Sequence, residues 1–142
     1  MIEMFSLLVR AVILNNGEVL LCQKKGEDYY FFPGGHVEFA EKAELTLARE
    51  LKEEIGVSPN RVNYIGTVEN LFEENGKKHH EINLVFKADI GNMPTKSLED
   101  HINFYWIKVS DIKNEKILPI ALKGCITEWV KNHQRFWGSQ NL

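Results

Sequence analysis

The stretch that decides the fold lies at residues 35–57 and reads GHVEFAEKAELTLARELKEEIGV. Its apolar residues Leu47, Leu51 and Ile55 recur every four positions, which is the spacing of one buried face of a helix. Gly56 follows directly, and glycine most easily takes the left-handed conformation that ends a helix. The stretch therefore predicts a helix that packs on a core through one side and stops sharply.

The same helix carries a concentrated negative charge. Glu50, Glu53 and Glu54 stand at i, i+3 and i+4, so their side chains meet on one part of the helix surface. Like charges at these spacings repel one another and cost helix stability. The ordinary interpretation is a solvated acidic face. The alternative is a site for a hard divalent cation such as Mg²⁺, which prefers oxygen ligands.

A longer pattern favours the second interpretation. The stretch satisfies G-x5-E-x7-R-E-U-x-E-E-x-G-U, where U is a bulky aliphatic residue, at Gly35, Glu41, Arg49, Glu50, Leu51, Glu53, Glu54, Gly56 and Val57. This pattern resembles the Nudix box of the Nudix hydrolases. The resemblance implies a single α+β domain over residues 1–142, with the box at 35–57. The implied architecture is the Nudix fold, an α/β/α sandwich with a mixed β-sheet.

The resemblance also implies a chemistry. Family members hydrolyse a nucleoside diphosphate linked to another group, such as a nucleoside triphosphate or a nucleotide sugar, by attack of water on phosphorus. Mg²⁺ would be the cofactor, with Mn²⁺ as a substitute. Its ligands would be Glu50, Glu53, Glu54 and the carbonyl of Gly35. Glu53 or Glu54 would also orient the attacking water, and Arg49 would hold the catalytic glutamates in place.

Family members often add an acidic residue from outside the box as general base or further metal ligand. Glu99, in the loop before an aromatic strand, is the candidate base, and its neighbour Asp100 is the alternative. Glu81, at the start of a strand, is the candidate for a further metal ligand. Each of these acids could equally be a solvated loop or edge charge, so the sequence leaves the choice open.

Residues that could bind the substrate are mostly aromatic. Tyr30, Phe72 and Tyr105 could each stack on a base, although core packing is the commoner role of such rings. His80 is expected to contact a phosphate or to lie in the core. Its neighbour His79 would point to the opposite face of a strand, which argues against a metal shared by the pair. Marker residues of the family branches that hydrolyse ADP-ribose or dinucleoside polyphosphates are absent, so the substrate stays open.

Composition limits the partners. The chain has 142 residues and a formal net charge of −3, which argues against an extended nucleic-acid surface and leaves a small nucleotide as the expected partner. The apolar N-terminal residues are interrupted by Arg10 and lack the basic start of a signal peptide. No apolar run is long enough to cross a bilayer, so we expect no membrane association and a cytoplasmic protein. Whether the protein forms a homodimer is left open.

The rest of the sequence predicts strands and one more helix. Apolar runs predict strands at 4–14, 18–23, 61–70, 80–90 and 103–109. The first two would form a β-hairpin around Asn15-Asn16-Gly17. The box helix is expected at 42–55, the longest loop at 91–101, a final helix at about 119–136 and a frayed tail at 138–142.

Two other functions are compatible with the implied fold. One is a nucleotide-sensing or regulatory domain without turnover, but such domains usually lose the box glutamates, which are all present here. The other is an isoprenoid isomerase, which needs an acid–base cysteine. Cys22 lies before the box in an apolar run, where it is expected to be a buried small hydrophobe. Hydrolysis is therefore the function that we expect.

Overall fold

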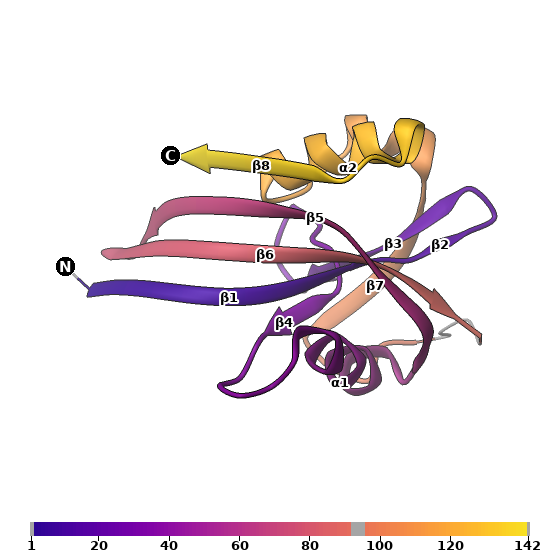
Figure 1. Ribbon diagram of the computed structural model, residues 1–142, viewed down its shortest axis with the longest axis horizontal. Helices are drawn as coiled ribbons and strands as arrows, with labels where there is room; N and C mark the ends of the chain where they lie inside the picture. Colours follow the sequence, from indigo (N-terminus) through magenta and orange to yellow (C-terminus); the bar gives the residue numbers. More distant parts are fainter. Residues whose placement is uncertain (1, 92–95, 142) are drawn as a thin grey trace.

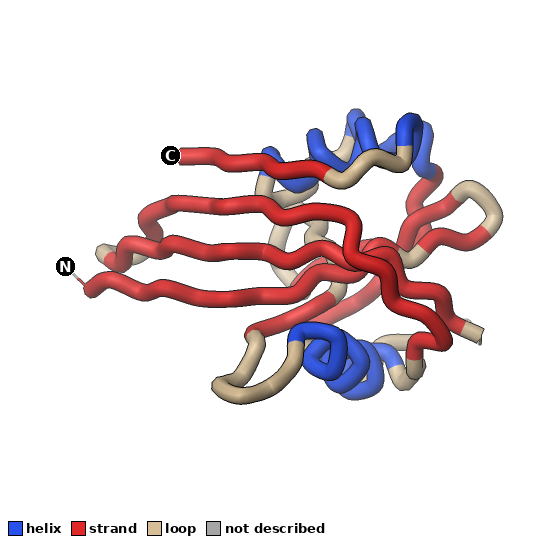
Figure 2. Tube along the Cα trace, in the orientation of Figure 1, coloured by secondary structure: helices blue, strands red, loops and turns tan. Residues whose placement is uncertain are grey.

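The computed structural model describes residues 2–91 and 96–141 of the chain. Its elements, coloured by type in Figure 2, are β1 (Ile2–Val12), β2 (Leu14–Asn15), β3 (Glu18–Lys24), β4 (Gly34–His36), α1 (Ala43–Ile55), β5 (Pro59–Glu74), β6 (Lys77–Ile90), β7 (Ile102–Lys108), the 3₁₀ helix η1 (Val109–Asn114), α2 (Ile120–Asn132) and β8 (Phe136–Asn141). Part of the predicted loop at 91–101 lies outside these residues. In the described part of the chain, neither helix is long and apolar enough to cross a membrane.

The strands form two sheets with helices on either side. The larger sheet has the order β4-β1-β6-β5-β8, and the smaller has the order β2-β3-β7. In the larger sheet β1 runs parallel to β6 and β8 runs parallel to β5, while β1–β4 and β5–β6 are antiparallel. Helix α1 lies on one side of the strands and α2 on the other (Figure 1). The predicted α+β sandwich with a mixed sheet is therefore confirmed.

Each helix closes a core of its own. The apolar stripe of α1 packs with strand residues such as Val9 and Leu20, whereas α2 packs with Val12 and Leu21. Leu20 and Leu21 are adjacent and reach opposite cores because successive strand residues point to opposite faces. A strand between two cores must be apolar on both faces, which explains the continuous apolar runs near the N-terminus.

The box helix ends as predicted. Gly56 has φ +70°, and its N–H donates to the carbonyl of Lys52. The side chains of Leu47 and Leu51 are fully buried, and Val57 joins the same core. The spacing of apolar residues and the terminal glycine therefore gave both the buried face of α1 and its end.

The predicted N-terminal hairpin is wrong in its first strand. The turn at Asn16-Gly17 joins β3 only to the two-residue strand β2, where Leu14 faces Val19. The long strand β1 instead pairs with β6 along its whole length and with β4 over three residues. Because β1 and β2 belong to different sheets, the apolar run at 4–14 serves both sheets in turn. A pattern of residue types does not record that change of partner.

The predicted C-terminal end is also wrong. The final helix stops at Asn132, where His133 takes a left-handed conformation with φ 55°. The tail that was expected to fray forms β8, the yellow arrow in Figure 1, beside β5. Side-chain contacts add to this pairing. Phe136 packs where Gly66 has no side chain, and the Gln140 side chain accepts a hydrogen bond of 2.6 Å from the N–H of Ala121.

Candidate active site

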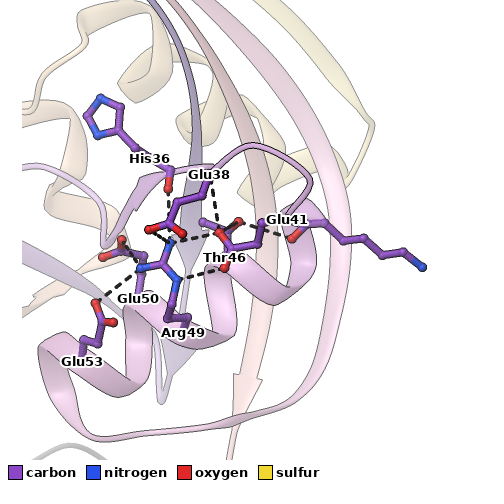
Figure 3. Close-up of polar contacts among 8 residues, drawn as sticks. His36, Glu38, Glu41, Thr46, Arg49, Glu50 and Glu53 are labelled. Atoms are coloured by element: carbon purple, nitrogen blue, oxygen red, sulfur yellow. Dashed lines mark hydrogen bonds and ion pairs between the residues drawn. The ribbon is translucent and has the colours of Figure 1, made fainter.

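Arg49 is the centre of a network on α1 (Figure 3). Its Nε and Nη2 donate to the two carboxylate oxygens of Glu41 at 2.9 and 3.0 Å. Its Nη1 donates to Glu50 at 3.1 Å and to Glu53 at 3.5 Å. The hydrogen bond from Arg49, helped by one from Thr46 at 2.6 Å, lowers the pKa of the Glu41 carboxyl to about 2. The Arg49 guanidinium is thus hydrogen-bonded to three carboxylates of the box.

Glu54 lies on the inner side of the same helix and has a different environment. Its side chain is buried, and its Oε2 has no hydrogen-bond partner. Burial raises the pKa of Glu54 to about 8, and the nearby charge of Glu50 adds to the increase. A buried carboxylate oxygen without a donor is costly, and a cation would satisfy it.

The backbone of β4 passes directly beside these acids. Gly35 pairs with Val9 of β1, and a Cβ added at Gly35 would lie 2.4–2.7 Å from the carboxylate atoms of Glu50. Any side chain at this position would displace Glu50. The glycine therefore leaves room for the Glu50 carboxylate to approach the strand closely.

The carboxylates do not meet at one point. Within residues 2–91 and 96–141, no three His, Cys, Asp or Glu side chains are placed closely enough to hold a metal ion together. Glu50 and Glu53 are turned toward Arg49, as Figure 3 shows. The buried Glu54 forms no ion pair with that cation within the described residues. The available donors are still carboxylate and carbonyl oxygens, which are the ligands that Mg²⁺ and Mn²⁺ accept.

Of the two acids from outside the box, Glu99 comes near this helix, while the charge of Glu81 acts on Arg10 of β1. The N–H of Leu98 donates to the Glu54 carbonyl at 2.8 Å, which docks the loop that carries Glu99. The charge of Glu99 contributes to the raised pKa of Glu54. Glu81 lies on β6, where its Oε1 accepts a weak hydrogen bond of 3.5 Å from Asn70. Asp100, the alternative to Glu99, is an exposed residue of the same loop.

Arg10 and Asn83 are site residues that the sequence reasoning missed. Arg10 lies on β1 among buried apolar residues, and its charge is influenced by Glu81, Glu54 and Glu50. Its Nε donates to the Oδ1 of the buried Asn83 at 3.4 Å. The signal was present in the sequence, because a lone arginine inside a run predicted to be buried on both faces needs a polar reason to be there.

The expected substrate-binding residues are not gathered at the box. His80 is hydrogen-bonded to Glu69 at 2.7 Å and, as the neighbour of Glu81 on β6, points to the opposite face of the sheet. Phe72 stacks on His79 with ring centroids 4.5 Å apart. Phe72 and His80 line a surface hollow of about 430 Å³ whose walls are Glu3, Met4, Phe5, Leu71, Phe72, Glu73, Lys78, His79, His80 and Asn141. No box residue lines that hollow.

Tyr30 and Tyr105 lie elsewhere. Their rings meet edge to face with centroids 5.7 Å apart, and Tyr30 packs against the core closed by α2. Its N–H and carbonyl bond to Lys116 and Leu118. Core packing therefore accounts for Tyr30, while the half-exposed ring of Tyr105 lies beside it.

Comparison with known proteins gives the family. The sequence profile of the NUDIX domain matches residues 4–129, which is most of the chain. The fold agrees, because the MutT protein of Bacillus halodurans superposes with a TM-score of 0.78 at 22% identity, covering 94% of this chain and 88% of that one. The MutT protein of Methanosarcina mazei gives 0.73 at 26% identity, covering 92% and 96%. The chain therefore belongs to the NUDIX domain family.

Curated relatives add two activities of other proteins. The nucleoside triphosphatase NudI of Klebsiella pneumoniae is 28% identical over 136 residues, covering 84% of this chain and 96% of the relative. An RNA pyrophosphohydrolase of Acinetobacter baylyi is 41% identical over 51 residues, covering 36% of this chain and 31% of the relative. The chain thus spans only about a third of the RNA pyrophosphohydrolases that it matches.

Proposed function

We propose that this protein is a divalent-metal-dependent pyrophosphohydrolase that cleaves a nucleoside diphosphate linked to another group. The observation that carries the proposal is the position of Glu54 beside Glu50. Glu54 is a buried acid with an unpartnered oxygen and a raised pKa, and Glu50 contacts a backbone strand from which a side chain is excluded. The buried, unpartnered oxygen of Glu54 costs stability unless a cation is bound, so it supports a metal-dependent reaction.

The metal would be Mg²⁺, with Mn²⁺ as a substitute. Glu50, Glu53, Glu54 and the carbonyl of Gly35 would hold it, with Glu81 as a further candidate. A bound Mg²⁺ supplies polarisation of a phosphoryl oxygen and lowers the pKa of a coordinated water.

The remaining roles belong to the side chains of the chain itself. Arg49 keeps Glu50 and Glu53 in place through the contacts on its Nη1, and Glu41 fixes Arg49 from the other side. Glu53 or Glu54 would orient the attacking water. Glu99 is the candidate general base, because its loop is docked on α1 next to Glu54.

The substrate is proposed only as a class. The relatives are named as acting on nucleoside triphosphates or on RNA, and the net charge of −3 favours a small nucleotide over a long nucleic acid. A panel of nucleoside triphosphates, nucleotide sugars, ADP-ribose, dinucleoside polyphosphates and 5′-triphosphorylated or capped RNA oligonucleotides, with products identified by mass, would assign both the substrate and the cleaved bond. Binding without release of phosphate or pyrophosphate from any of these would identify a nucleotide sensor instead.

Glu53→Gln tests the proposed reaction. Glu53 is half-exposed, with its side chain at 53% exposure, so the variant should keep the fold. Loss of one ligand charge should lower kcat by about 100-fold or more, as is usual when an essential charged group of an active site is removed. The matched control is Glu44→Gln, an exposed glutamate in the first turn of α1, which should retain wild-type turnover. Near-normal turnover of Glu53→Gln would remove Glu53 from the metal site.

A further inference from the structure

Arg10 is a cation placed in an apolar strand and held on two sides. Its neighbours on β1, Val9 and Ala11, are fully buried. Its Nη1 donates to the carbonyl of Phe32 at 3.0 Å, and its Nε donates to Asn83. Asn83 is itself fixed, because its Nδ2 donates to the Val68 carbonyl at 3.4 Å. A charge is costly to bury, so a guanidinium anchored in this way indicates more than packing.

The anchoring contact reaches the segment that leads into the candidate metal site. Phe32 stands three residues before Gly35, and Arg10 lies directly opposite Gly34 in the pairing of β1 with β4. The guanidinium carbon also lies 6.0 Å from the ring centroid of Phe31. Arg10 therefore ties the backbone of residues 31–35 to the central strands of the larger sheet.

Three acids near Arg10 raise its pKa without forming an ion pair with it. Burial lowers the pKa of Arg10, and the charges of Glu81, Glu54 and Glu50 oppose that effect, with Glu81 the strongest of these acids. Within the described residues, none of these three forms an ion pair with Arg10. The Nη2 amino group also has no hydrogen-bond acceptor among those residues. Arg10 is only partly buried, so the unpaired side of its guanidinium can accept an anion.

We propose that Arg10 binds a phosphoryl oxygen of the substrate through Nη2 while its other nitrogens hold the Phe32–Gly35 segment. This inference rests on the proposed pyrophosphohydrolase function. A bound metal ion would neutralise the carboxylates of Glu50 and Glu54. Arg10 would then be free to pair with a phosphate of the substrate. The planar guanidinium fork suits phosphate oxygens better than an ammonium does.

The test is binding of imidodiphosphate, a pyrophosphate analogue that resists hydrolysis, measured by calorimetry in the presence of Mg²⁺. Arg10→Met should weaken binding about 10- to 100-fold, because a hydrogen bond to a charged group is lost. Arg10→Lys keeps the charge without the fork and should weaken binding about 3- to 10-fold. The control is Arg61→Met, which removes an exposed arginine of β5 and should bind as the wild type does.

A second measurement separates phosphate binding from metal binding. Affinity for Mn²⁺ alone, followed by electron paramagnetic resonance, should stay within about threefold of wild type in the Arg10 variants, since carboxylates bind the metal. An equal loss of Mn²⁺ affinity would show that Arg10 only supports the metal site, and the proposal would fail. Unchanged imidodiphosphate affinity in a folded Arg10→Met would also overturn it. If that variant does not fold, Arg10→Lys decides by the same criterion.

The pyrophosphohydrolase function and the phosphate role of Arg10 can fail separately. If the wild-type protein hydrolyses no nucleotide but binds imidodiphosphate through Arg10, the phosphate role of Arg10 stands and the enzymatic function is rejected. If the wild-type protein turns over a nucleotide, and Arg10→Met has the same KM and the same imidodiphosphate affinity, the enzymatic function stands and the phosphate role of Arg10 is rejected. No detectable imidodiphosphate binding by the wild type would overturn the role of Arg10.

Discussion

At the residue scale, Glu50 and Glu54 lie one helical turn apart but have different surroundings. Glu50 is a neighbour of Arg49 and shares its positive charge. Glu54, one turn further along, is buried and receives no such contact. The spacing in the sequence placed both on one side of the helix, but the burial of Glu54 distinguishes them.

Glu54 gives a prediction about the pH dependence of stability. Its pKa is about 8 in the folded protein against an ordinary 4.5. Between these values the folded protein holds a proton that the unfolded chain has released, so the free energy of unfolding falls as pH rises from about 4.5 to about 8. The metal-free protein should therefore melt at a lower temperature at pH 8 than at pH 5.5, measured by circular dichroism.

Glu54→Gln is the matched variant for that measurement. The amide is nearly isosteric and does not titrate, so the fall in melting temperature between pH 5.5 and pH 8 should become smaller. An equally steep fall in Glu54→Gln would mean that other groups cause the pH dependence and that Glu54 is ionised in the folded protein.

At the element scale, the link between β4 and α1 contains local strain. Ala40 has φ 67°, a left-handed conformation that costs a residue with a Cβ about 1–2 kcal/mol. The next residue is Glu41, which holds Arg49 in place through two hydrogen bonds. The chain therefore accepts an unfavourable backbone conformation in the loop that delivers an acid to the site.

Ala40→Gly should relieve this strain. Glycine reaches the left-handed region without steric cost, and this gain exceeds the extra entropy that glycine loses on folding. We expect a gain of about 0.5–1 kcal/mol in unfolding free energy, measured by urea denaturation. The control is Ala48→Gly inside α1, which should cost about 1 kcal/mol. A destabilised Ala40→Gly would contradict the strain.

At the scale of the whole molecule, β8 connects the larger sheet to α2. Gly138 lies beside Val68 of β5, and a Cβ added there would lie 2.6 Å from the sulfur of Cys125. The start of α2 is tied to the same strand through Gln140. Helix and strand therefore share one closely packed interface at the end of the chain.

Gly138→Ala measures that interface. The added methyl group meets Cys125, so overpacking should cost about 1–3 kcal/mol of unfolding free energy. Adding Cys125→Ala removes the clashing sulfur and should recover at least about half of the loss, as a double-mutant cycle would detect. Gly124→Ala is the control, because among the described residues no atom beyond its own stretch of α2 lies within 4 Å of the added Cβ. It should stabilise α2 by up to about 1 kcal/mol. Additive effects of the Gly138 and Cys125 changes would contradict the contact.

Much of the candidate site could be predicted because its residues are close in sequence. Helical spacing determines that Arg49, Glu50 and Glu53 share one surface and that Leu47 and Leu51 are buried. Arg10 and Glu99 come from two other segments, and their approach to Glu54 depends on strand order and loop docking. The position of His80 could not be predicted in this way, because the face of the sheet on which it lies follows from the register of β6.

The sequence by itself determined the family, the box helix, the glycine that ends it and the acidic surface that suits a metal. These features depend on interactions within a few helical turns, which residue spacing records directly. Only the tertiary structure decided that β1 pairs with β6, that residues 136–141 form a strand, and that Arg10 lies among the acids of the site. Those arrangements depend on how the whole chain buries its apolar surface and satisfies its strand edges, which no single stretch determines.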